Sequence, residues 1–495
     1  MRRTVAEAAV AMGGEILRGD PDARWTRASL DSRRVEGGEL FFALRGERVD
    51  GHDFVVAALQ RGAAGAVVER AVKVDNGTEA AAGGGPATGA TPLMPSGALI
   101  RVPKVYDALH ALTRAVRREV PQHLVGITGS SGKTTTKELL ALCLGRKYRV
   151  SKSAGNLNNL LGFPLTLLST PENTEWLVAE MGMSLSGELA EISRMARPDV
   201  ALFTNVRPVH LEGLGSLEAI AAAKSELLEG LANDGLVVAN ADDRWVRWIA
   251  ARWTTRGNGR VVWYGGDSEY RIEGVTARNV AAAGRRADET QPGGTRFRLV
   301  TPEGAAAVEL PLHGAYNAEN FLAAAACAHT LGVPLAAIVE AAASAAPVGG
   351  RGAVRALGNG ATLIDDSYNS NPVALRRALE SARALPGKRH WAVLGDMLEL
   401  GPEAPRFHRE EGEAAARLGF APVAGVGELS RALVEGAAAG AESHWFSTAA
   451  EAAAWAKAQL RPGDVVLVKG SRGVHLEKVV AALLSDAPGE AEGGH

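Results

Sequence analysis

Short apolar runs alternate along the chain with segments of helical periodicity. In the middle of the chain, the apolar runs are His123–Thr128, Trp176–Glu180, Val200–Thr204, Leu236–Asn240 and Val261–Tyr264. Such runs are typical of strands buried on both faces, and the helices between them favour a parallel sheet. After residue 349 the alternation begins again, with strands predicted at Thr362–Asp365, Trp391–Leu394, Val423–Val426 and Val465–Val468. Helices predicted over residues 374–385, 403–418, 448–459 and 474–484 make this a second, doubly wound α/β unit.

The first hundred residues mix short strands with helices. Strands are predicted at Glu39–Leu44, Gly65–Glu69 and Ala98–Val102, with a helix over residues 52–60. Residues 71–97 are rich in Ala, Gly, Thr and Pro, a composition that predicts a disordered surface insertion. Residues 281–294 are rich in Gly, Ala, Arg and Asp and are predicted to form a loop between edge strands, and the tail after Ala487 is predicted to be disordered.

At 495 residues the chain is too long for one ordinary hydrophobic core. We therefore predict an α/β protein of three domains, over residues 1–103, 104–348 and 349–495. The first is a small mixed α/β domain, the second carries the parallel sheet, and the third is Rossmann-like.

Composition narrows the classes of partner. The 54 Lys and Arg residues are balanced by 56 Asp and Glu, which gives no electrostatic reason to expect nucleic acid or an anionic membrane. Cys143 and Cys327 lie in apolar helical stretches and are predicted to be core residues. Charged residues appear too early for a signal peptide, and no run approaches the roughly 18 apolar residues of a membrane span. The sequence therefore predicts a cytoplasmic protein.

A glycine-rich loop lies between a predicted strand and a predicted helix. It reads Gly126-Ile-Thr-Gly129-Ser130-Ser131-Gly132-Lys133-Thr134-Thr135. Glycines let backbone N–H groups surround phosphate oxygens, a lysine can reach the outer phosphates, and the first threonine can bind Mg²⁺. Ile127 stands where the common G-x-x-x-x-G-K-[ST] pattern has its first glycine. The loop predicts ATP binding; the alternative is a chance Gly/Ser turn before a helix.

Polar groups also end other strands of the central sheet. Glu180 ends an apolar strand, and ligands of open parallel sheets bind at the carboxyl ends of the strands. We therefore predict that Glu180 binds Mg²⁺, with a solvated strand-end glutamate as the alternative. His210 follows the next strand, but a lone loop histidine is more often structural. Lys224 lies on a predicted helix, where a lysine normally faces solvent.

With these elements in order, the chain resembles the Mur ligase family over nearly its whole length. The loop matches that family's T-G-x-x-G-K-T, and Glu180, His210 and Lys224 match its acidic residue, its histidine and its helical lysine. The resemblance implies a central phosphate-loop ATPase domain. It also implies that Lys224 is carbamylated and, with His210, binds a second Mg²⁺, while Thr134 and Glu180 bind the first.

Other motifs resemble substrate-binding segments of the family. Asp31-Ser32-Arg33 and Gly46–Phe54 resemble the UDP-muramoyl-binding domain. The segment with Asn156, Asn158 and Asn159 resembles the family's loop near the uridine-linked substrate. Asn317-Ala-Glu-Asn320 resembles the adenine-side motif, although Tyr316 replaces the usual histidine. Arg351 matches an arginine at the last domain junction. The resemblance implies that Asn320, Arg351 and Asp365 hold the nucleotide.

The C-terminal motifs resemble the members of the family that add D-alanyl-D-alanine. These are Asp365-Asp366-Ser-Tyr368-Asn369-Ser-Asn371-Pro372, Gly395-Asp396-Met-Leu-Glu399-Leu-Gly401 with His408, and Lys469-Gly-Ser-Arg472. Asn369 and Asn371 are the candidates for orienting the dipeptide. The resemblance implies an ATP- and magnesium-dependent amide ligase that acts on UDP-N-acetylmuramoyl tripeptide through an acyl phosphate in peptidoglycan precursor synthesis. We expect a monomer whose C-terminal domain closes over ATP.

Two alternatives remain open. One is another Mur-type ligase, which would add a dibasic amino acid or glutamate. The other is a nucleotide-switched binding protein that has a phosphate loop but no ligase chemistry. The first alternative is tested by asking which amine acceptor supports phosphate release. The second is tested by product formation, because a binding protein would form no product.

Overall fold

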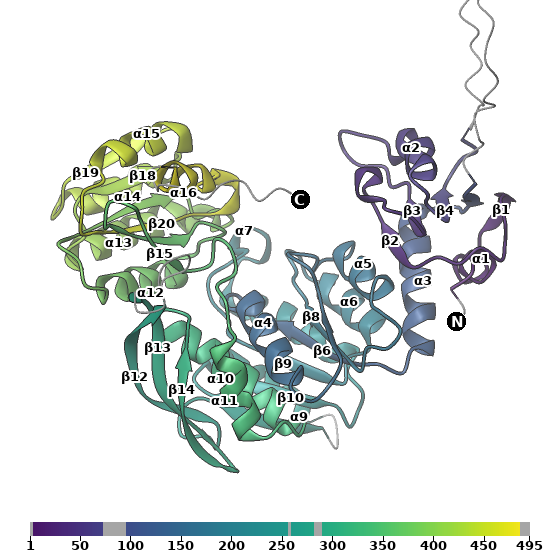
Figure 1. Cartoon of the computed structure of the whole chain (residues 1–495), viewed down its shortest axis with the longest axis horizontal. Coiled ribbons are helices and arrows are strands. Elements are labelled where there is room, and N and C mark those ends of the chain that lie inside the picture. Colours follow the sequence, from purple (N-terminus) through teal and green to yellow (C-terminus); the bar gives the residue numbers. More distant parts are fainter. Residues whose placement is uncertain (1–2, 73–95, 256–258, 282–289, 486–495) are drawn as a thin grey trace, which may run out of the picture.

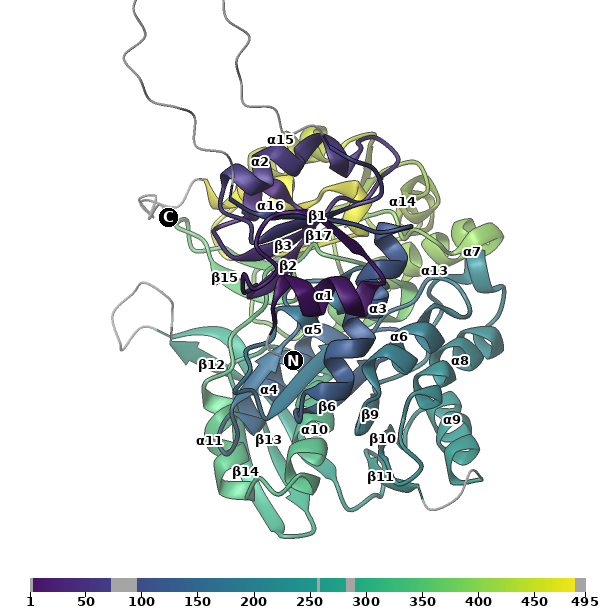
Figure 2. The same ribbon diagram turned by 90° about the vertical axis from the view of Figure 1, so that its right-hand side faces the viewer.

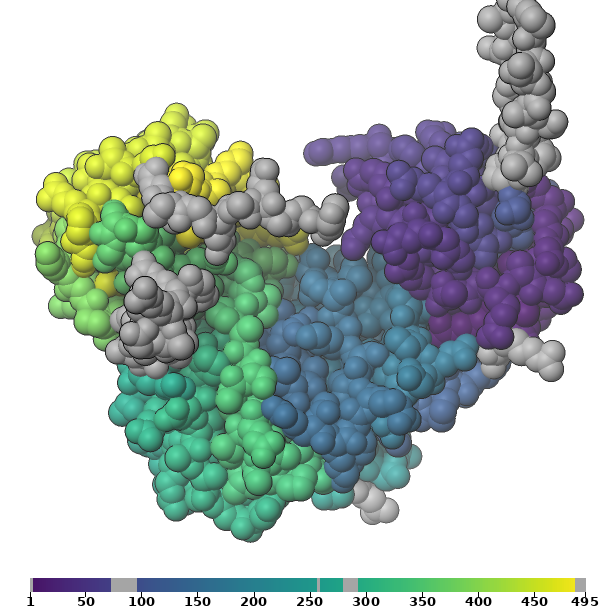
Figure 3. Space-filling model, viewed as in Figure 1, coloured from purple at the N-terminus to yellow at the C-terminus, as the bar shows by residue number. Residues whose placement is uncertain are grey.

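The computed structural model of the chain describes residues 3–72, 96–255, 259–281 and 290–485. The chain forms three α/β parts in sequence order, here called the N-terminal part (α1 to β5), the central part (α3 to α11) and the C-terminal part (β15 to α16) (Figure 1). Figure 3 shows the N-terminal and C-terminal parts as separate lobes on the central part. The predicted fold class is confirmed. Within these ranges no helix has the length and apolar character needed to cross a bilayer.

The N-terminal part is a five-stranded sheet in the order β1-β5-β4-β3-β2, in which β1 is antiparallel to β5 and the other pairs are parallel. Its strands are β1 (Glu15–Arg18), β2 (Arg27–Ser29), β3 (Glu39–Phe42), β4 (Gly65–Val68) and β5 (Ala98–Arg101). Its helices are α1 (Val5–Met12) and α2 (Val55–Gln60), with 3-10 turns η1 (Ser32–Arg34) and η2 (Gly51–Phe54). Most of the predicted insertion, residues 73–95, lies outside the described residues.

The central part contains a six-stranded, fully parallel sheet in the order β11-β10-β9-β6-β8-β7. Its strands are β6 (His123–Thr128), β7 (Val150–Lys152), β8 (Trp176–Glu180), β9 (Val200–Phe203), β10 (Leu236–Asn240) and β11 (Arg260–Tyr264). The helices are α4 (Lys133–Leu144), α5 (Gly162–Leu168), α6 (Glu188–Ala196), α7 (Leu211–Leu214), α8 (Leu217–Ser225), α9 (Arg244–Thr254), α10 (Ala315–Thr330) and α11 (Leu335–Ala343).

Helices cover both faces of this sheet. Val125 and Ile127 of β6 pack with α4, α10 and α11, whereas Leu124 belongs to the core formed with α5, α6, α8 and α9. Both faces are apolar, as predicted for these strands. Cys143 and Cys327 are buried and free in the first of these cores, which confirms their prediction as core residues.

A separate antiparallel sheet packs beside α10. It consists of β12 (Arg271–Ala281), β13 (Thr290–Thr301) and β14 (Gly304–Leu310). The prediction of a loop over 281–294 was wrong at both ends, because residue 281 and residues 290–294 belong to paired strands; residues 282–289 lie outside the description. Ladder hydrogen bonds join backbone groups, so the pairing of β12 with β13 can keep a segment extended even where its composition does not favour a strand.

The C-terminal part has a six-stranded sheet in the order β15-β16-β20-β17-β18-β19, parallel except for β15. Its strands are β15 (Ala353–Ala356), β16 (Thr362–Asp366), β17 (Arg389–Gly395), β18 (Val423–Val426), β19 (Ser443–Phe446) and β20 (Asp464–Lys469). Its helices are α12 (Pro372–Arg383), α13 (Ala404–Arg417), α14 (Ser430–Ala438), α15 (Ala449–Gln459) and α16 (Glu477–Leu484). The helices α12–α14 and α15–α16 cover opposite faces, as a doubly wound fold requires.

Helix α3 (Val105–Glu119) joins the N-terminal and central parts. Val105, Leu109 and Leu112 pack in the core beneath the N-terminal sheet, and Leu168 of α5 belongs to the same core. Figure 2 shows α3 between α1 and α6. The first core is therefore continuous with the central part.

Arg3 stabilises the junction between the N-terminal and central parts. Its guanidinium is buried and donates to the carbonyls of Thr26, Leu168 and Thr170, at 2.9, 3.1 and 3.1 Å. We expect Arg3→Met to lower the free energy of unfolding by about 2–3 kcal/mol, because the substitution leaves these acceptors without their charged donor. Chemical denaturation followed by circular dichroism measures the change. The exposed Arg24→Met is the control, and equal effects of the two substitutions would contradict this role.

Candidate active site

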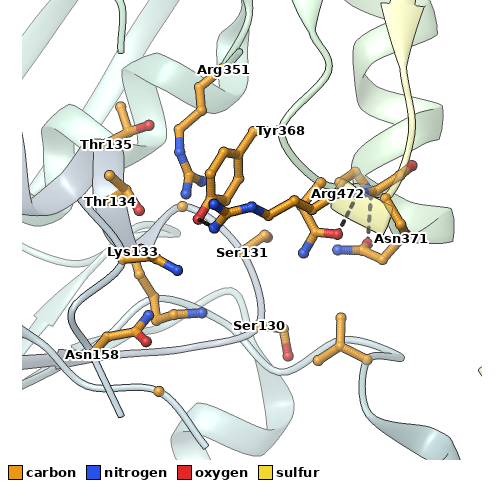
Figure 4. Close-up of a pocket in the computed structure, with 18 of the residues that line it drawn as sticks. Ser130, Ser131, Lys133, Thr134, Thr135, Asn158, Arg351, Tyr368, Asn371 and Arg472 are labelled. Carbon is orange, nitrogen blue, oxygen red and sulfur yellow. Dashed lines mark hydrogen bonds between the residues drawn. The ribbon is translucent and has the colours of Figure 1, made fainter. Parts of the chain in front are cut away.

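A cavity of about 530 Å³ lies between the central and C-terminal parts. Its walls include the loop before α4, the end of β8, the segment after β9 and the segments after β16 and β20. Figure 4 shows Ser131 of the loop, with Lys133 and Thr134 at the start of α4, facing Arg351, Tyr368 and Arg472 of the C-terminal part. The parallel strands of both sheets thus direct their carboxyl ends toward one space.

Two glycines allow the loop to follow its path. Gly129 has a φ of +150°, and a Cβ there would lie 1.9 Å from Thr204 Oγ1; at Gly132, with a φ of +82°, it would lie 2.3 Å from Asn320 Oδ1. The segment after β9 then fixes the loop, since Ser131 N donates to Asn205 Oδ1 at 3.0 Å. These contacts explain why the shorter glycine pattern still forms a phosphate-type loop.

Lys133 is the first residue of α4. Its Nζ donates to Gly129 O at 2.8 Å, so the side chain folds back over the loop. Burial lowers the pKa of Lys133, Glu180 opposes this effect and Arg351 adds to it. The lysine and the helix N-terminus together concentrate positive potential at the loop.

Glu180 is held at the end of β8 by two donors. Thr134 Oγ1 donates to Oε2 at 2.7 Å, and Asn158 Nδ2 donates to Oε1 at 2.9 Å. Over the described residues, no group of three or more His, Cys, Asp and Glu side chains could hold a metal. Mg²⁺ is commonly held by one or two carboxylates together with substrate phosphates. The Thr134–Glu180 pair fits that kind of site.

His210 and Lys224 line the same cavity. His210 precedes α7, and its Nδ1 lies 2.5 Å from Glu399 Oε2 of the C-terminal part. This hydrogen bond lowers the pKa of Glu399. Lys224 of α8 is 3% exposed, and its ammonium forms no hydrogen bond or ion pair with the described residues. Burial, and then the charge of Lys133, places the pKa of Lys224 well below its usual value.

The C-terminal part contributes a cluster of cations around Tyr368. The guanidinium of Arg351 lies 4.1 Å and that of Arg472 lies 5.4 Å from the centre of the Tyr368 ring (Figure 4). Lys469 Nζ lies 2.6 Å from Asp366 Oδ2, and this lysine opposes the effect of burial, which raises the pKa of Asp366. Tyr316 also lines the cavity, and burial raises its pKa.

Most of the predicted site residues meet in this cavity. Those that line it are Ser130, Ser131, Gly132, Lys133, Thr134, Thr135, Asn156, Asn158, Asn159, Glu180, His210, Lys224, Asn320, Arg351, Asn369 and Asn371. Four others lie outside its lining. Gly129 precedes the lining residues of the loop, and its carbonyl accepts from Lys133 Nζ. Ser32 and Arg33 belong to η1 of the N-terminal part, and Asp365 is buried, with its Oδ1 accepting from Ser367 Oγ at 2.6 Å.

Several lining residues were not predicted as site residues. They include Asp366, Tyr368, Arg377, Glu399, Lys469 and Arg472. All except Arg377 lie in the motifs noted in the sequence, but a motif does not reveal which of two adjacent residues faces a cavity. Asp365 and Asp366 illustrate this, because consecutive side chains of a strand point to opposite faces.

Three family matches cover most of the chain. The Mur ligase middle domain matches residues 127–328, the "Mur ligase, glutamate ligase domain" matches residues 350–472, and the "Mur ligase family, catalytic domain" matches residues 26–117. A relative from Bacillus subtilis (strain 168), called UDP-N-acetylmuramoyl-tripeptide--D-alanyl-D-alanine ligase, is 32% identical over 98% of this chain and 99% of its own. The chain belongs to the Mur ligase family. An Escherichia coli (strain K12) Mur ligase of the same name is 35% identical over 95% of this chain and 96% of its own.

Solved Mur ligase structures have the same architecture. MurF from Acinetobacter baumannii superimposes with a TM-score of 0.81 at 29% identity, over 97% of this chain and 98% of its own. MurF ligase from Thermotoga maritima, solved in complex with ADP, gives a TM-score of 0.74 at 28% identity, over 93% of this chain and 97% of its own. The three-part Mur ligase fold therefore extends over nearly the whole chain.

Proposed function

We propose that this Mur ligase joins D-alanyl-D-alanine to UDP-N-acetylmuramoyl tripeptide, with hydrolysis of ATP, in peptidoglycan precursor synthesis. The observation that carries the proposal is the full-length similarity to ligases of that name, at 32% and 35% identity. The cavity supports the proposal, because a phosphate loop lies on one side of it and a second set of cations and amides lies on the other. We further propose that the protein acts as a cytoplasmic monomer, with domains at residues 1–103, 104–348 and 349–495.

The phosphate loop would hold the ATP phosphates. Backbone N–H groups of residues 132–135 and the Lys133 ammonium would supply the donors, and the ADP complex of the Thermotoga maritima relative supports this assignment. Asn320 and Arg351 would hold the nucleotide from the two sides of the cavity. Asp365 lies outside the lining and would act through the turn at Ser367.

Thr134 and Glu180 would bind the nucleotide's Mg²⁺, and His210 with carbamylated Lys224 would bind a second ion. Bound Mg²⁺ supplies charge neutralisation that lets an anionic carboxylate approach the γ-phosphate. The lowered pKa of Lys224 supports carbamylation, since the neutral amine is the form that reacts with CO₂. A carbamate would also place an anion near the Lys133 ammonium, which would repel a protonated Lys224.

The reaction would proceed in two steps. The terminal carboxylate of the tripeptide attacks the γ-phosphorus, ADP leaves and an acyl phosphate forms; the dipeptide amine then attacks the acyl carbon and phosphate leaves. Lys133 would stabilise the charge on the transferred group. Ser32, Arg33, Asn156, Asn158 and Asn159 would hold the UDP-muramoyl substrate. Asn369 and Asn371 would orient the dipeptide.

Phosphate release tests the proposal directly. Purified protein is given ATP, Mg²⁺ and UDP-N-acetylmuramoyl tripeptide, with and without D-alanyl-D-alanine. We expect stoichiometric phosphate and a pentapeptide product only when the dipeptide is present. Phosphate release with a dibasic amino acid or glutamate instead would indicate another ligase of the family. Nucleotide binding without product would indicate a binding protein.

Glu180→Gln provides a test of the first metal site. We expect turnover to fall by about 100-fold and the Mg²⁺ concentration for half-maximal rate to rise, because an amide is a weaker Mg²⁺ ligand than a carboxylate. Titrating Mg²⁺ in the phosphate-release assay measures both effects. Glu175→Gln is the control, since Glu175 precedes the other end of β8 and its carboxylate accepts from Arg149 N. An unchanged Mg²⁺ requirement in Glu180→Gln would contradict the assignment.

A further inference from the structure

A contact between the central and C-terminal parts involves His210 and Glu399. In addition to the bond between His210 Nδ1 and Glu399 Oε2, the backbone N of Glu212 donates to Glu399 O at 3.2 Å. Leu211 packs against the cores of both parts. Figure 1 shows α7 at the edge of the central part nearest the C-terminal part. The segment 210–212 is therefore docked on the C-terminal part by a side-chain bond, a backbone bond and an apolar contact.

The backbone at both residues is unusual. His210 has a φ of 54° and Glu399 a φ of 63°, and both are left-handed conformations at residues that carry a Cβ. Such residues persist where the surrounding structure fixes them, and they are common at functional sites. The two conformations bring the imidazole and the carboxylate together from opposite sides of the domain boundary.

The hydrogen bond to Glu399 also determines which ring nitrogen of His210 is available to a ligand in the cavity. A neutral imidazole that donates through Nδ1 to a carboxylate has its lone pair on Nε2. Nε2 forms no hydrogen bond with any described residue, and His210 lines the cavity. In metal sites, a carboxylate at the far ring nitrogen fixes the tautomer and the orientation of the histidine.

We propose that Glu399 is a positioning residue that presents Nε2 of His210 to the second metal ion, so that this site is completed only when the C-terminal part docks on α7. This inference rests on the proposed function, in which His210 binds that ion. Glu399 therefore links the arrangement of the domains to the site at which the acyl phosphate would form. The carboxylate acts through the imidazole and does not itself contact the reacting atoms.

The test compares Glu399→Ala, Glu399→Gln, His210→Ala and the double variant His210→Ala/Glu399→Ala. For Glu399→Ala we expect kcat to fall by about 10–100-fold and half-saturation by Mg²⁺ to shift upward, with KM for ATP within about twofold. Glu399→Gln retains an amide oxygen that can accept from Nδ1, so we expect it to lie within about threefold of the wild type. The double variant should be no worse than His210→Ala, because Glu399 acts through His210.

A readout independent of turnover accompanies the kinetics. Mn²⁺ binding in the presence of ADP, followed by electron paramagnetic resonance, should show weaker binding of one ion in Glu399→Ala and wild-type binding in Glu399→Gln. The control is Glu428→Ala, since Glu428 is an exposed carboxylate of the same part that pairs with Arg431. Equal melting temperatures would show that the variants are folded.

Three results would overturn the inference while the wild type remains an active ligase. They are wild-type kinetics in Glu399→Ala, equal losses in Glu399→Ala and Glu399→Gln, and losses that multiply in the double variant. If the wild type itself forms no product, the proposed function has failed. In that case the Mn²⁺ measurement alone decides the role of Glu399: identical binding in the wild type and Glu399→Ala overturns it.

Discussion

Replacing Lys133 with alanine is expected to reduce ligase turnover by at least about 100–1,000-fold, the effect of losing one preorganised donor to developing negative charge. The ammonium lies over the loop at 2.8 Å from Gly129 O, and it is buried beside Glu180 and Arg351. A bound nucleotide would replace part of its lost hydration with phosphate oxygens. Lys133→Arg should also fail, because a planar guanidinium differs from a compact ammonium in shape and reach.

Phosphate release at saturating substrates measures this loss. The control is Lys147→Ala, because Lys147 lies just beyond the other end of α4 and its exposed ammonium donates to Gly332 O. We expect that variant to keep wild-type activity. If Lys133→Ala retained more than about a tenth of the wild-type activity, the proposed role of Lys133 in stabilising the transferred group would be wrong.

Lys224→Ala is expected to lower activity by about 10–100-fold, the range for loss of a group at a metal site. Millimolar formate or acetate should restore part of it, because either anion can occupy the space left by the side chain and supply the carboxylate oxygens of a carbamate. The space exists because Lys224 is almost fully buried and lines the cavity. Activity against anion concentration, with sodium chloride at equal ionic strength as the control, measures the rescue.

Two outcomes would rule out the carbamate at Lys224. One is full activity of Lys224→Ala without added anion, which would show that the second metal site does not need this residue. The other is equal rescue by chloride and formate, which would point to a general salt effect. A mass increase of the intact wild-type protein that disappears at acidic pH would provide independent support.

The sequence predicted the central and C-terminal sheets well, since their strands are apolar on both faces. β6, β8, β10 and β18 have the predicted bounds. Strand β19 (Ser443–Phe446) was not predicted, because it is half-buried and mixes polar with aromatic residues. Helix α14, which precedes it, was not predicted either. For the sheet of β12–β14, the sequence predicted only a loop between edge strands without their bounds, because these strands include small and polar residues that do not mark a strand by themselves.

The central half of the candidate site could be predicted because it lies in one loop and at successive strand ends. The contribution of the C-terminal part could not be predicted at the same level. Glu399 lies 189 residues from its partner His210, and no local pattern links them. The stacking of Arg351 and Arg472 on Tyr368 likewise depends on how two segments about a hundred residues apart fold together.

The division of the cavity between two lobes has a consequence for inhibitors. A compound that spans from the phosphate loop to Tyr368 binds only molecules whose lobes have this spacing, so its apparent affinity falls with the fraction of molecules in that state. The affinity of a compound that binds only the phosphate loop does not depend on the spacing of the lobes, but such a compound makes no contacts with the C-terminal lobe. Potency in a screen would therefore depend on which substrates were present to bring the lobes together.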